Sequence, residues 1–340
     1  MRFCCGNCIG DRYIRRDIIP SISEVDGTCS FCNSANVQLV EPVSLRERFE
    51  LLLSIYTPDP EGKILVEWLR EDWAIFDLPQ MQTAHAKELL AEILDDGDIV
   101  RKPFSPLRNC HTNSLEEWSG LREELKHRNR FFPEMGLDLA RLEELFPHLI
   151  FDELTPEKPF YRSRIQSSGG PYDKDQMGAP PEFLATHGRA NPAGIPYLYL
   201  ASTPLTAISE IRPHTGEKIS VGEFIIPEGL KFVDLRQPRK TVSPFILDDE
   251  NDVATLRGDI MFLERLGEEL TRPVLPKAAA IDYIPSQFLC EFAKKCGFDG
   301  VVYRSSVGEG MNIALFNPTI SECRSVSEYS VSRVSVEAHT

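Results

Sequence analysis

The spacing of hydrophobic positions predicts helices over residues 42–152. Between Leu45 and Tyr56, apolar residues recur at intervals of three and four, which is the period of a helix with one buried face. The same period predicts four more helices, Ile64–Trp73, Gln82–Leu94, Ser114–Arg128 and Asp138–Phe146. Two capping boxes, Ser44-x-x-Glu47 and Ser114-x-x-Glu117, are expected to begin two of the five. Prolines separate the helices, so this region is predicted to form a small helical bundle.

Beyond residue 152 the pattern changes to short apolar runs that alternate with helical periods. The runs predict strands at Pro196–Ala201, Val221–Ile226, Leu230–Leu235, Val301–Tyr303 and Asn312–Phe316. Helices are expected at Pro204–Ile211, Val253–Leu270 and Ser286–Lys295. Thr203 is placed to cap the first of these, because proline at the next position suits the start of a helix. Prolines 156 and 159 mark a linker before this mixed α/β region.

The first 41 residues contain two closely spaced cysteine pairs. The pairs are Cys5-x2-Cys8 and Cys29-x2-Cys32, with 20 residues between them. This spacing is typical of a zinc ribbon, in which each C-x-x-C turn directs two thiolates at one ion. Four thiolates leave no open coordination position, so we expect structural Zn²⁺ rather than a catalytic metal. Cys4 could replace Cys5 as a ligand.

Composition restricts the classes of protein and partner. The chain has 340 residues, 42 % hydrophobic and 26 % charged, which is typical of a globular protein of two or three domains. Its apolar runs are too short to span a membrane, and the amino-terminal residues lack the apolar core of a signal peptide. We therefore expect a cytoplasmic protein. The net charge of −15 argues against general affinity for nucleic acids, which need clustered Lys and Arg.

These patterns predict an α+β protein with four consecutive parts. Residues 1–41 form the zinc ribbon, 42–152 the helical domain, 153–325 the mixed α/β domain and 326–340 a flexible tail.

Three clusters in the third part combine residue types that suit a nucleotide. They are Tyr161-Arg162, then Gly188-Arg189-Ala190-Asn191-Pro192 followed by Tyr199 and Glu210, and finally Tyr303-Arg304-Ser305-Ser306 followed by Asn312. Guanidinium groups match the oxygens of a pyrophosphate, aromatic rings stack on planar bases, and a carboxylate stabilises a developing cation. The chain has neither a Rossmann glycine fingerprint nor a P-loop, so a bound dinucleotide would be consumed rather than used as a redox carrier.

With these clusters, residues 155–320 resemble the RES domain family. The matching stretches are Phe-Tyr-Arg at 160–162, Gly-Arg-Ala-Asn-Pro-Ala-Gly at 188–194, Tyr-Leu-Tyr-Leu-Ala at 197–201, Ala-Ile-Ser-Glu at 207–210, Asp-Gly-Val-Val-Tyr-Arg-Ser at 299–305 and Asn-Ile-Ala-Leu-Phe at 312–316. The family is named for an Arg, a Glu and a Ser, and it includes toxins of bacterial toxin–antitoxin systems. The upstream region resembles the zinc-binding and helical, HEPN-like region that precedes the RES domain in some longer members.

The resemblance implies a fold similar to ADP-ribosyltransferases and NAD+ as the substrate. Members degrade NAD+ by hydrolysis or phosphorolysis, or transfer its ADP-ribose to a protein, and act as toxins or defence effectors. By position, the family's catalytic residues would correspond to Arg189, Glu210 and Ser305. Tyr199 would correspond to a pocket tyrosine of the family and Arg162 to an additional NAD+-contacting arginine. Tyr161, as a stacking ring, and Asn312, at the head of the last strand, are further candidates for contact with the dinucleotide. Ala190 and Arg304 depart from the usual pattern, which has an aromatic residue after the arginine and a proline before the serine.

Other functions remain open at this point. Arg122 and His127 have the spacing of the Arg/His pair of dimeric HEPN-type ribonucleases, in which the arginine steadies a phosphate and the histidine transfers protons. The ribbon could instead serve a nucleic-acid-binding adaptor. The order of segments also suggests that the amino-terminal region meets an antitoxin or activating partner that restrains the enzyme. The sequence decides neither that partner, nor the acceptor of ADP-ribose, nor whether the chain forms homo-oligomers.

Overall fold

The computed structural model describes residues 2–107, 113–134, 136–167, 169–275 and 277–334, and it divides into two compact units. The first unit comprises residues 1–115 and 238–263, and the second comprises residues 116–237 and 264–340. Each unit therefore combines two stretches of chain, whereas the sequence analysis expected domains in chain order. The long helix α10 (Glu250–Thr271) contributes residues to both.

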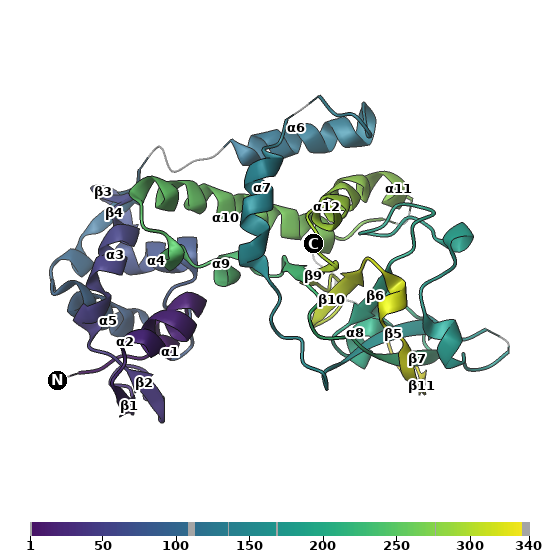
Figure 1. Ribbon diagram of the computed structural model, residues 1–340, viewed down its shortest axis with the longest axis horizontal. Coiled ribbons are helices and arrows are strands. Elements are labelled where there is room, and N and C mark those ends of the chain that lie inside the picture. Colours follow the sequence, from purple (N-terminus) through teal and green to yellow (C-terminus); the bar gives the residue numbers. More distant parts are fainter. Residues whose placement is uncertain (1, 108–112, 135, 168, 276, 335–340) are drawn as a thin grey trace. The chain divides into compact units, whose positions relative to one another are not determined.

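The first unit is mainly helical (Figure 1). Its helices are α1 (Gly6–Ile9), α2 (Ile19–Ile22), α3 (Arg46–Leu53), α4 (Leu65–Trp73), α5 (Thr83–Leu94) and α9 (Pro238–Thr241). Short turns of 3-10 or π-helix cover Ile14–Ile18, Pro42–Leu45, Ile99–Arg101 and Pro244–Ile246. Strands β1 (Val25–Gly27) and β2 (Val37–Leu39) form an antiparallel pair beside the cysteines, and β3 (Tyr56–Ile64) pairs with β4 (Pro103–Pro106).

Two expectations for this unit were wrong in detail. Helix α3 begins at Arg46 without a side-chain cap, because the 3-10 turn that starts at Pro42 draws Ser44 into a hydrogen bond with the Glu41 carbonyl instead. The β3–β4 pair also interrupts the predicted all-helical bundle. Its strands contain four prolines, Pro58, Pro60, Pro103 and Pro106, which were interpreted from the sequence only as breaks between helices.

A seven-stranded sheet forms the centre of the second unit. Its strands are β5 (Pro159–Ile165), β6 (Leu198–Ala201), β7 (Lys218–Ile225), β8 (Phe232–Asp234), β9 (Gly300–Arg304), β10 (Met311–Leu315) and β11 (Cys323–Ser330). Their order across the sheet is β11-β7-β5-β6-β10-β9-β8, and all pairs are antiparallel except β8–β9. The structure therefore confirms the mixed α/β class of this region.

Helices and short turns complete the second unit. The helices are α6 (Ser114–His127), α7 (Leu139–Leu145), α8 (Pro204–Glu210), α11 (Ala279–Asp282) and α12 (Ile284–Lys295). Turns of 3-10 helix cover Phe146–Leu149, Lys174–Met177, Glu182–Leu184 and Pro318–Ile320. A core that includes Phe160, Leu198, Phe224, Val302 and Ile313 is fully buried in the sheet. Burial of such side chains stabilises the fold by about 1.5–3 kcal/mol each.

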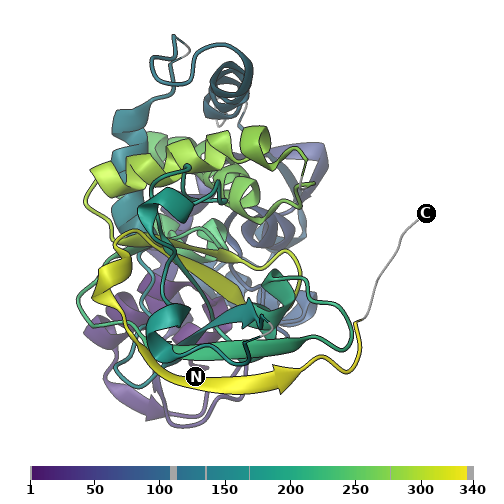
Figure 2. The same ribbon diagram turned by 90° about the vertical axis from the view of Figure 1, so that its right-hand side faces the viewer.

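The prediction of a flexible tail is wrong for residues 326–330. Residues 326–330 belong to β11, which pairs with β7 at the edge of the sheet (Figure 2). Residues 335–340 lie outside the described part of the chain.

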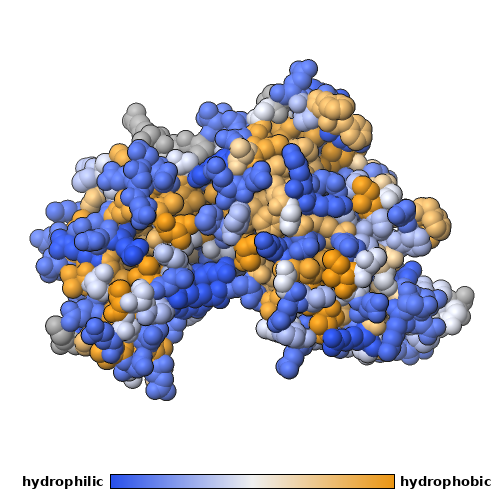
Figure 3. All heavy atoms as spheres, in the orientation of Figure 1, coloured by the Kyte–Doolittle hydropathy of each residue, from blue (hydrophilic) through white to orange (hydrophobic). Residues whose placement is uncertain are grey.

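On the face that Figure 3 shows, hydrophilic residues predominate and apolar ones appear in scattered groups, as expected for a chain with 26 % charged residues. Within the described residues, none of the helices has the length and apolar character needed to cross a bilayer.

Candidate active site

Local sequence signals place Glu210 at the end of α8. The Thr203 side chain accepts a hydrogen bond from the Thr206 amide and Pro204 occupies the first turn, as predicted. The helix has seven residues, so Glu210 is its last residue. A carboxylate at this end faces the negative pole of the helix, so it depends on donors from elsewhere.

Those donors come from two other segments of the sheet. Ser305 Oγ, just after β9, donates to Glu210 Oε1 at 2.7 Å, and Asn312 Nδ2, on β10, donates to the same oxygen at 2.6 Å. Among the described residues no hydrogen bond reaches Oε2, which leaves that oxygen available to a ligand. The Ser305 oxygen also accepts from the Val307 amide at 3.3 Å, so this hydroxyl orients the carboxylate and is not set up as a nucleophile.

Glu210 opens into a cavity of about 300 Å³ in the second unit. That volume is at the lower end of the range of about 300–1,000 Å³ for ligand pockets. Six of the seven site residues suggested by the sequence line it, namely Tyr161, Arg162, Arg189, Tyr199, Glu210 and Asn312. The seventh, Ser305, contacts the cavity through Glu210.

Arg162 is a cation buried in the cavity wall without an anionic partner among the described residues. Its NH1 donates only a long bond of 3.4 Å to the Tyr199 carbonyl, and its buried Nε has no hydrogen-bond partner. Burial, together with the neighbouring Arg164, lowers the pKa of Arg162 to about 10, so it remains charged at neutral pH. A buried, unpaired guanidinium is costly unless a ligand supplies the missing acceptor.

Ser163 adds a second unsatisfied group to the same wall. Its buried hydroxyl has no hydrogen-bond partner among the described residues, and it lines the cavity beside Arg162. Ser163 was not predicted as a site residue. The only available signal was its position next to Arg162 in a predicted motif.

Tyr199 acts on the loop that carries Arg189. Its hydroxyl donates to Asn191 Oδ1 at 2.7 Å and accepts from the Ala190 amide at 3.0 Å. Burial raises the pKa of Tyr199, so the hydroxyl remains a donor. Gly188 packs so closely against this pair that a Cβ would overlap the Asn191 and Tyr199 oxygens. Tyr199 therefore positions the loop, while its ring still lines the cavity.

Arg189 is held by backbone carbonyls. Its NH1 donates to the carbonyls of Leu270 at 3.3 Å and Arg272 at 2.6 Å, at the carboxyl end of α10. Its NH2 donates to Ser306 Oγ at 3.0 Å. No carboxylate of the described residues lies within ion-pair distance of Arg189, so its full charge remains available to an anion.

Three further aromatic residues line the cavity without having been proposed as site residues. Tyr283 lies with its ring centroid 5.5 Å from the Arg189 guanidinium carbon, and His187 and Tyr303 complete this part of the wall. Tyr283 lies between two predicted elements and carries no periodic or motif signal.

The proposed ribonuclease pair does not form a site in the structure. Arg122 lies on α6 with its Nε 2.8 Å from Glu269 Oε1, so its charge already has a partner. His127 is exposed, and its nearest carboxylate is Glu123 at 3.8 Å. Residues five apart on a helix project in different directions, which explains why the two side chains do not converge.

The four amino-terminal cysteines gather in the first unit. Cys5, Cys8, Cys29 and Cys32 have their sulfur atoms within 4.8 Å of one another. The Cys8–Cys29 distance is 3.2 Å, Cys5–Cys32 is 3.5 Å and Cys5–Cys8 is 4.0 Å. Four thiolates around one Zn²⁺ at about 2.3 Å would lie roughly 3.8 Å apart, so the cluster fits a tetrahedral zinc site. Cys4 is fully buried but is not part of this group.

Comparison with known proteins now identifies the family. The RES domain model matches residues 159–334, just over half of the chain, and the protein belongs to the RES domain family. Among solved structures, the chain is similar to one in the crystal structure of the M. tuberculosis MbcT–MbcA toxin–antitoxin complex. The sequences are 13 % identical, the match covers 56 % of this chain and 93 % of the other, and the TM-score is 0.32. This likeness is distant, so the family assignment rests on the family model. Comparison with curated proteins gives no match.

Proposed function

We propose that the protein cleaves the bond between nicotinamide and ribose in NAD+, in a fold of the ADP-ribosyltransferase type. Family membership and the contents of the cavity support this proposal together. The observation that carries it is that one cavity contains both Arg162, which has no anionic partner among the described residues, and an oriented carboxylate, Glu210. A site that binds and cleaves NAD+ needs both a guanidinium and a carboxylate, because NAD+ joins an anionic pyrophosphate to a cationic nicotinamide riboside.

Arg162 and Arg189 are assigned to the pyrophosphate. Among the described residues, Arg162 has only the neutral Tyr199 carbonyl as an acceptor, at 3.4 Å, and its Nε has none. Arg189 also has only neutral acceptors, so both retain charge for phosphate oxygens. Tyr161 and Tyr283 offer ring faces to the nicotinamide or the ribose along the same cavity.

Glu210 is assigned to the reacting ribose. As the bond to nicotinamide breaks, positive charge develops on the ribose, and a nearby carboxylate stabilises it. Nicotinamide leaves as a neutral molecule, so no acid is needed at the leaving group. Glu210 Oε2 can then accept a proton from the incoming water. The balanced reaction is NAD+ plus water to ADP-ribose, nicotinamide and a proton.

The experiment that tests this function is mass spectrometry of NAD+ incubated with the purified protein. We expect nicotinamide together with ADP-ribose. A phosphorylated ADP-ribose in phosphate buffer would indicate phosphorolysis, and a mass increase on a protein would indicate ADP-ribosyl transfer. Intact NAD+ under all these conditions would contradict the proposal.

A matched pair of variants assigns the chemistry to the cavity. Glu210→Gln keeps the size of the side chain but removes the charge, and is expected to slow nicotinamide release by about 10²-fold or more. The control is Glu228→Gln, an exposed glutamate of the same unit, which should leave the rate unchanged. Equal rates in the two variants would remove Glu210 from the mechanism.

We further propose that this activity arrests growth and requires an antitoxin or activating partner. Continuous loss of NAD+ would harm the host cell, so restraint is expected. Induced expression of the wild-type chain should lower cellular NAD+ and stop growth, whereas Glu210→Gln should do neither. Growth arrest with an unchanged cellular concentration of NAD+ would show that toxicity does not arise from NAD+ cleavage.

We also infer that the amino-terminal cysteines bind structural Zn²⁺, because four sulfur atoms already lie at near-tetrahedral spacing. Zinc would cross-link the short β1–β2 segment, which buries few large side chains of its own. The cysteines must remain reduced to bind the ion, so we place the protein in the cytoplasm.

A further inference from the structure

The position of Arg189 depends on the last turn of α10. Two of its three side-chain hydrogen bonds go to carbonyls at that end of the helix, those of Leu270 and Arg272. The shorter one, 2.6 Å to the Arg272 carbonyl, involves a residue just beyond the helix. A small displacement of this turn would therefore move the guanidinium within the cavity.

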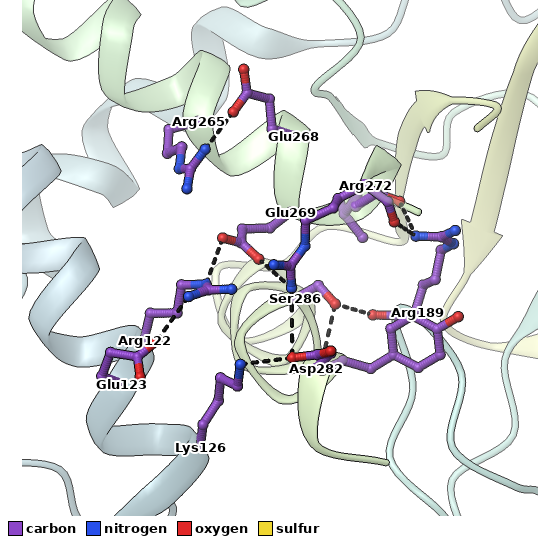
Figure 4. A network of polar contacts seen from close by, with 12 residues as sticks. Arg122, Glu123, Lys126, Arg189, Arg265, Glu268, Glu269, Arg272, Asp282 and Ser286 are labelled. Carbon is purple, nitrogen blue, oxygen red and sulfur yellow. Dashed lines mark hydrogen bonds and ion pairs between the residues drawn. The ribbon is translucent and has the colours of Figure 1, made fainter. Parts of the chain in front are cut away.

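A partly buried ion-pair network holds this turn (Figure 4). Its centre is Glu269, whose side chain is only 2 % exposed. Arg122 Nε of α6 lies 2.8 Å from Glu269 Oε1, and Arg272 NH2 lies 3.7 Å from Glu269 Oε2. One carboxylate on the last turn of α10 thus stands between two guanidinium groups.

Helices α6 and α11 complete the network. Lys126 Nζ lies 2.6 Å from Asp282 Oδ1, and Arg272 NH2 lies 3.9 Å from the same oxygen. Arg122 and Lys126 are four residues apart, so they share one face of α6. The two cations of α6 therefore meet an anion of α10 and an anion of α11.

Arg272 belongs both to the ion-pair network and to the carbonyl contacts that hold Arg189. Its side chain lies between the carboxylates of Glu269 and Asp282, and its backbone carbonyl accepts from Arg189. The chain of contacts from α6 to the cavity is accordingly Arg122, Glu269, Arg272 and Arg189, and each contact is shorter than 4 Å.

The contacts of Glu269 with Arg122 and Arg272 depend on charge more than on hydrogen bonds. The Arg122 Nε–H does not point at the nearby Glu269 oxygen, and the Arg272 Nε and NH2 atoms form no hydrogen bond with any described residue. Glu269 therefore keeps two like charges together mainly by Coulomb attraction, which is stronger for a buried carboxylate than for an exposed one. Its loss would leave the two guanidinium groups to repel each other.

We propose that Glu269 is a positioning residue that sets the Arg189 guanidinium through Arg272, with Arg122 as its support on α6. The proposal rests on the proposed function, in which Arg189 binds the NAD+ pyrophosphate. Neutralising Glu269 releases Arg272, shifts its carbonyl and weakens the hold on Arg189. Glu210 and its donors come from other segments, so substrate binding should suffer more than the chemical step.

The test compares two neighbouring glutamates of one helix. Glu269→Gln removes the buried anion, whereas the control Glu268→Gln removes a surface anion that pairs with Arg265 at 2.7 Å. We expect Glu269→Gln to raise KM for NAD+ on the order of tenfold with little change in kcat, and the control to change neither. A tenfold change corresponds to about 1.4 kcal/mol.

A double-mutant cycle separates positioning from general destabilisation. If Glu269 acts through Arg189, then Glu269→Gln has no further effect on KM in an Arg189→Ala background. An equal rise of KM in both backgrounds would overturn the proposal.

A second readout needs no turnover. The Nε–Hε signal of Arg189 in ¹⁵N-labelled protein is identified by its loss in Arg189→Ala, and it should shift in Glu269→Gln but not in Glu268→Gln. If Glu269→Gln does not fold, Arg122→Gln is the second variant. It removes the α6 partner of Glu269 and leaves the Glu269 carboxylate paired with Arg272. The Arg189 signal is expected to shift in this variant as well. An unchanged signal overturns the proposal, whereas a shifted signal in a protein that does not consume NAD+ supports it and rejects only the proposed function.

Discussion

Ser305 Oγ donates a hydrogen bond to Glu210 Oε1 at 2.7 Å, across 95 residues of sequence. Asn312 adds a second bond to the same oxygen at 2.6 Å. In the proposed assignment, Ser305 and Glu210 correspond to the serine and the glutamate that help to name the RES family, and the two side chains are in direct contact. A carboxylate fixed at one oxygen presents the other in a defined direction, and this geometry leads to the first prediction.

Ser305→Ala and Asn312→Ala should each lower kcat for NAD+ cleavage with a smaller effect on KM. A hydrogen bond to a charged group contributes about 1.5–3 kcal/mol, which corresponds to about tenfold to a hundredfold in rate. Steady-state kinetics of nicotinamide release measure the effect. Ser327→Ala, at an exposed position of β11, is the control and should behave as the wild type. Normal kcat in both cavity variants would show that Glu210 needs no such orientation.

Gly188→Ala should disturb the Arg189 loop. The added methyl group would overlap Asn191 Oδ1 and the Tyr199 hydroxyl, and overpacking of this kind costs typically about 1–3 kcal/mol. We expect a lower melting temperature and weaker binding of ADP-ribose. Gly178→Ala is the matched control, because a Cβ there meets no atom within 4 Å. Equal melting temperatures and affinities in the two variants would contradict this account of the loop.

Binding of ADP-ribose should weaken as the pH rises through about 10. Burial lowers the pKa of Arg162 to about 10, so the group is a cation below this pH and becomes neutral above it. The pyrophosphate then loses one of its two guanidinium partners. Calorimetric titrations between pH 8 and 11 measure the change. Arg162→Gln should bind weakly throughout, and its affinity should fall less over this interval. A parallel fall in both proteins would assign the titration to another group.

Zinc content should depend on Cys5 and not on Cys4. Elemental analysis of the purified wild-type chain should find one zinc ion per chain. Cys5→Ala should lose the ion and the fold of the β1–β2 segment, because three thiolates bind zinc less tightly and structural zinc contributes directly to folding. Cys4→Ala should retain the ion, since Cys4 lies outside the four-sulfur cluster. The opposite pattern would show that Cys4 is the ligand.

Much of the secondary structure could be predicted from local signals. Thr203 and Pro204 mark the start of α8 because a cap and a preset φ act within a few residues. The apolar period of Val253–Leu270 locates most of α10 for the same reason. The prediction was wrong where the chain pairs with a distant segment, as in β3–β4 and in the part of β11 that had been assigned to the tail.

Only those site residues that lie in recognisable motifs were predicted from the sequence. Arg162, Arg189 and Glu210 stand in recognisable stretches, so the sequence could suggest that they share a cavity. Ser163 and Tyr283 belong to the cavity only because the strand and the α11–α12 junction face it. Arg122, considered as part of a nuclease pair, instead contacts Glu269, a partner with no signal in the local sequence.

The sequence alone therefore determined where most helices and strands lie, which four cysteines can share an ion, and which residue types could meet a dinucleotide. These features depend on neighbours a few positions away. The tertiary structure alone decided that Ser305 and Asn312 hold Glu210 and that carbonyls at the carboxyl end of α10 hold Arg189. It also decided that Arg162 has no counter-ion among the residues that the structure describes. Such contacts join residues that are far apart in the sequence and meet only when the sheet and helices pack. No pattern of neighbouring residues in the sequence can therefore predict them.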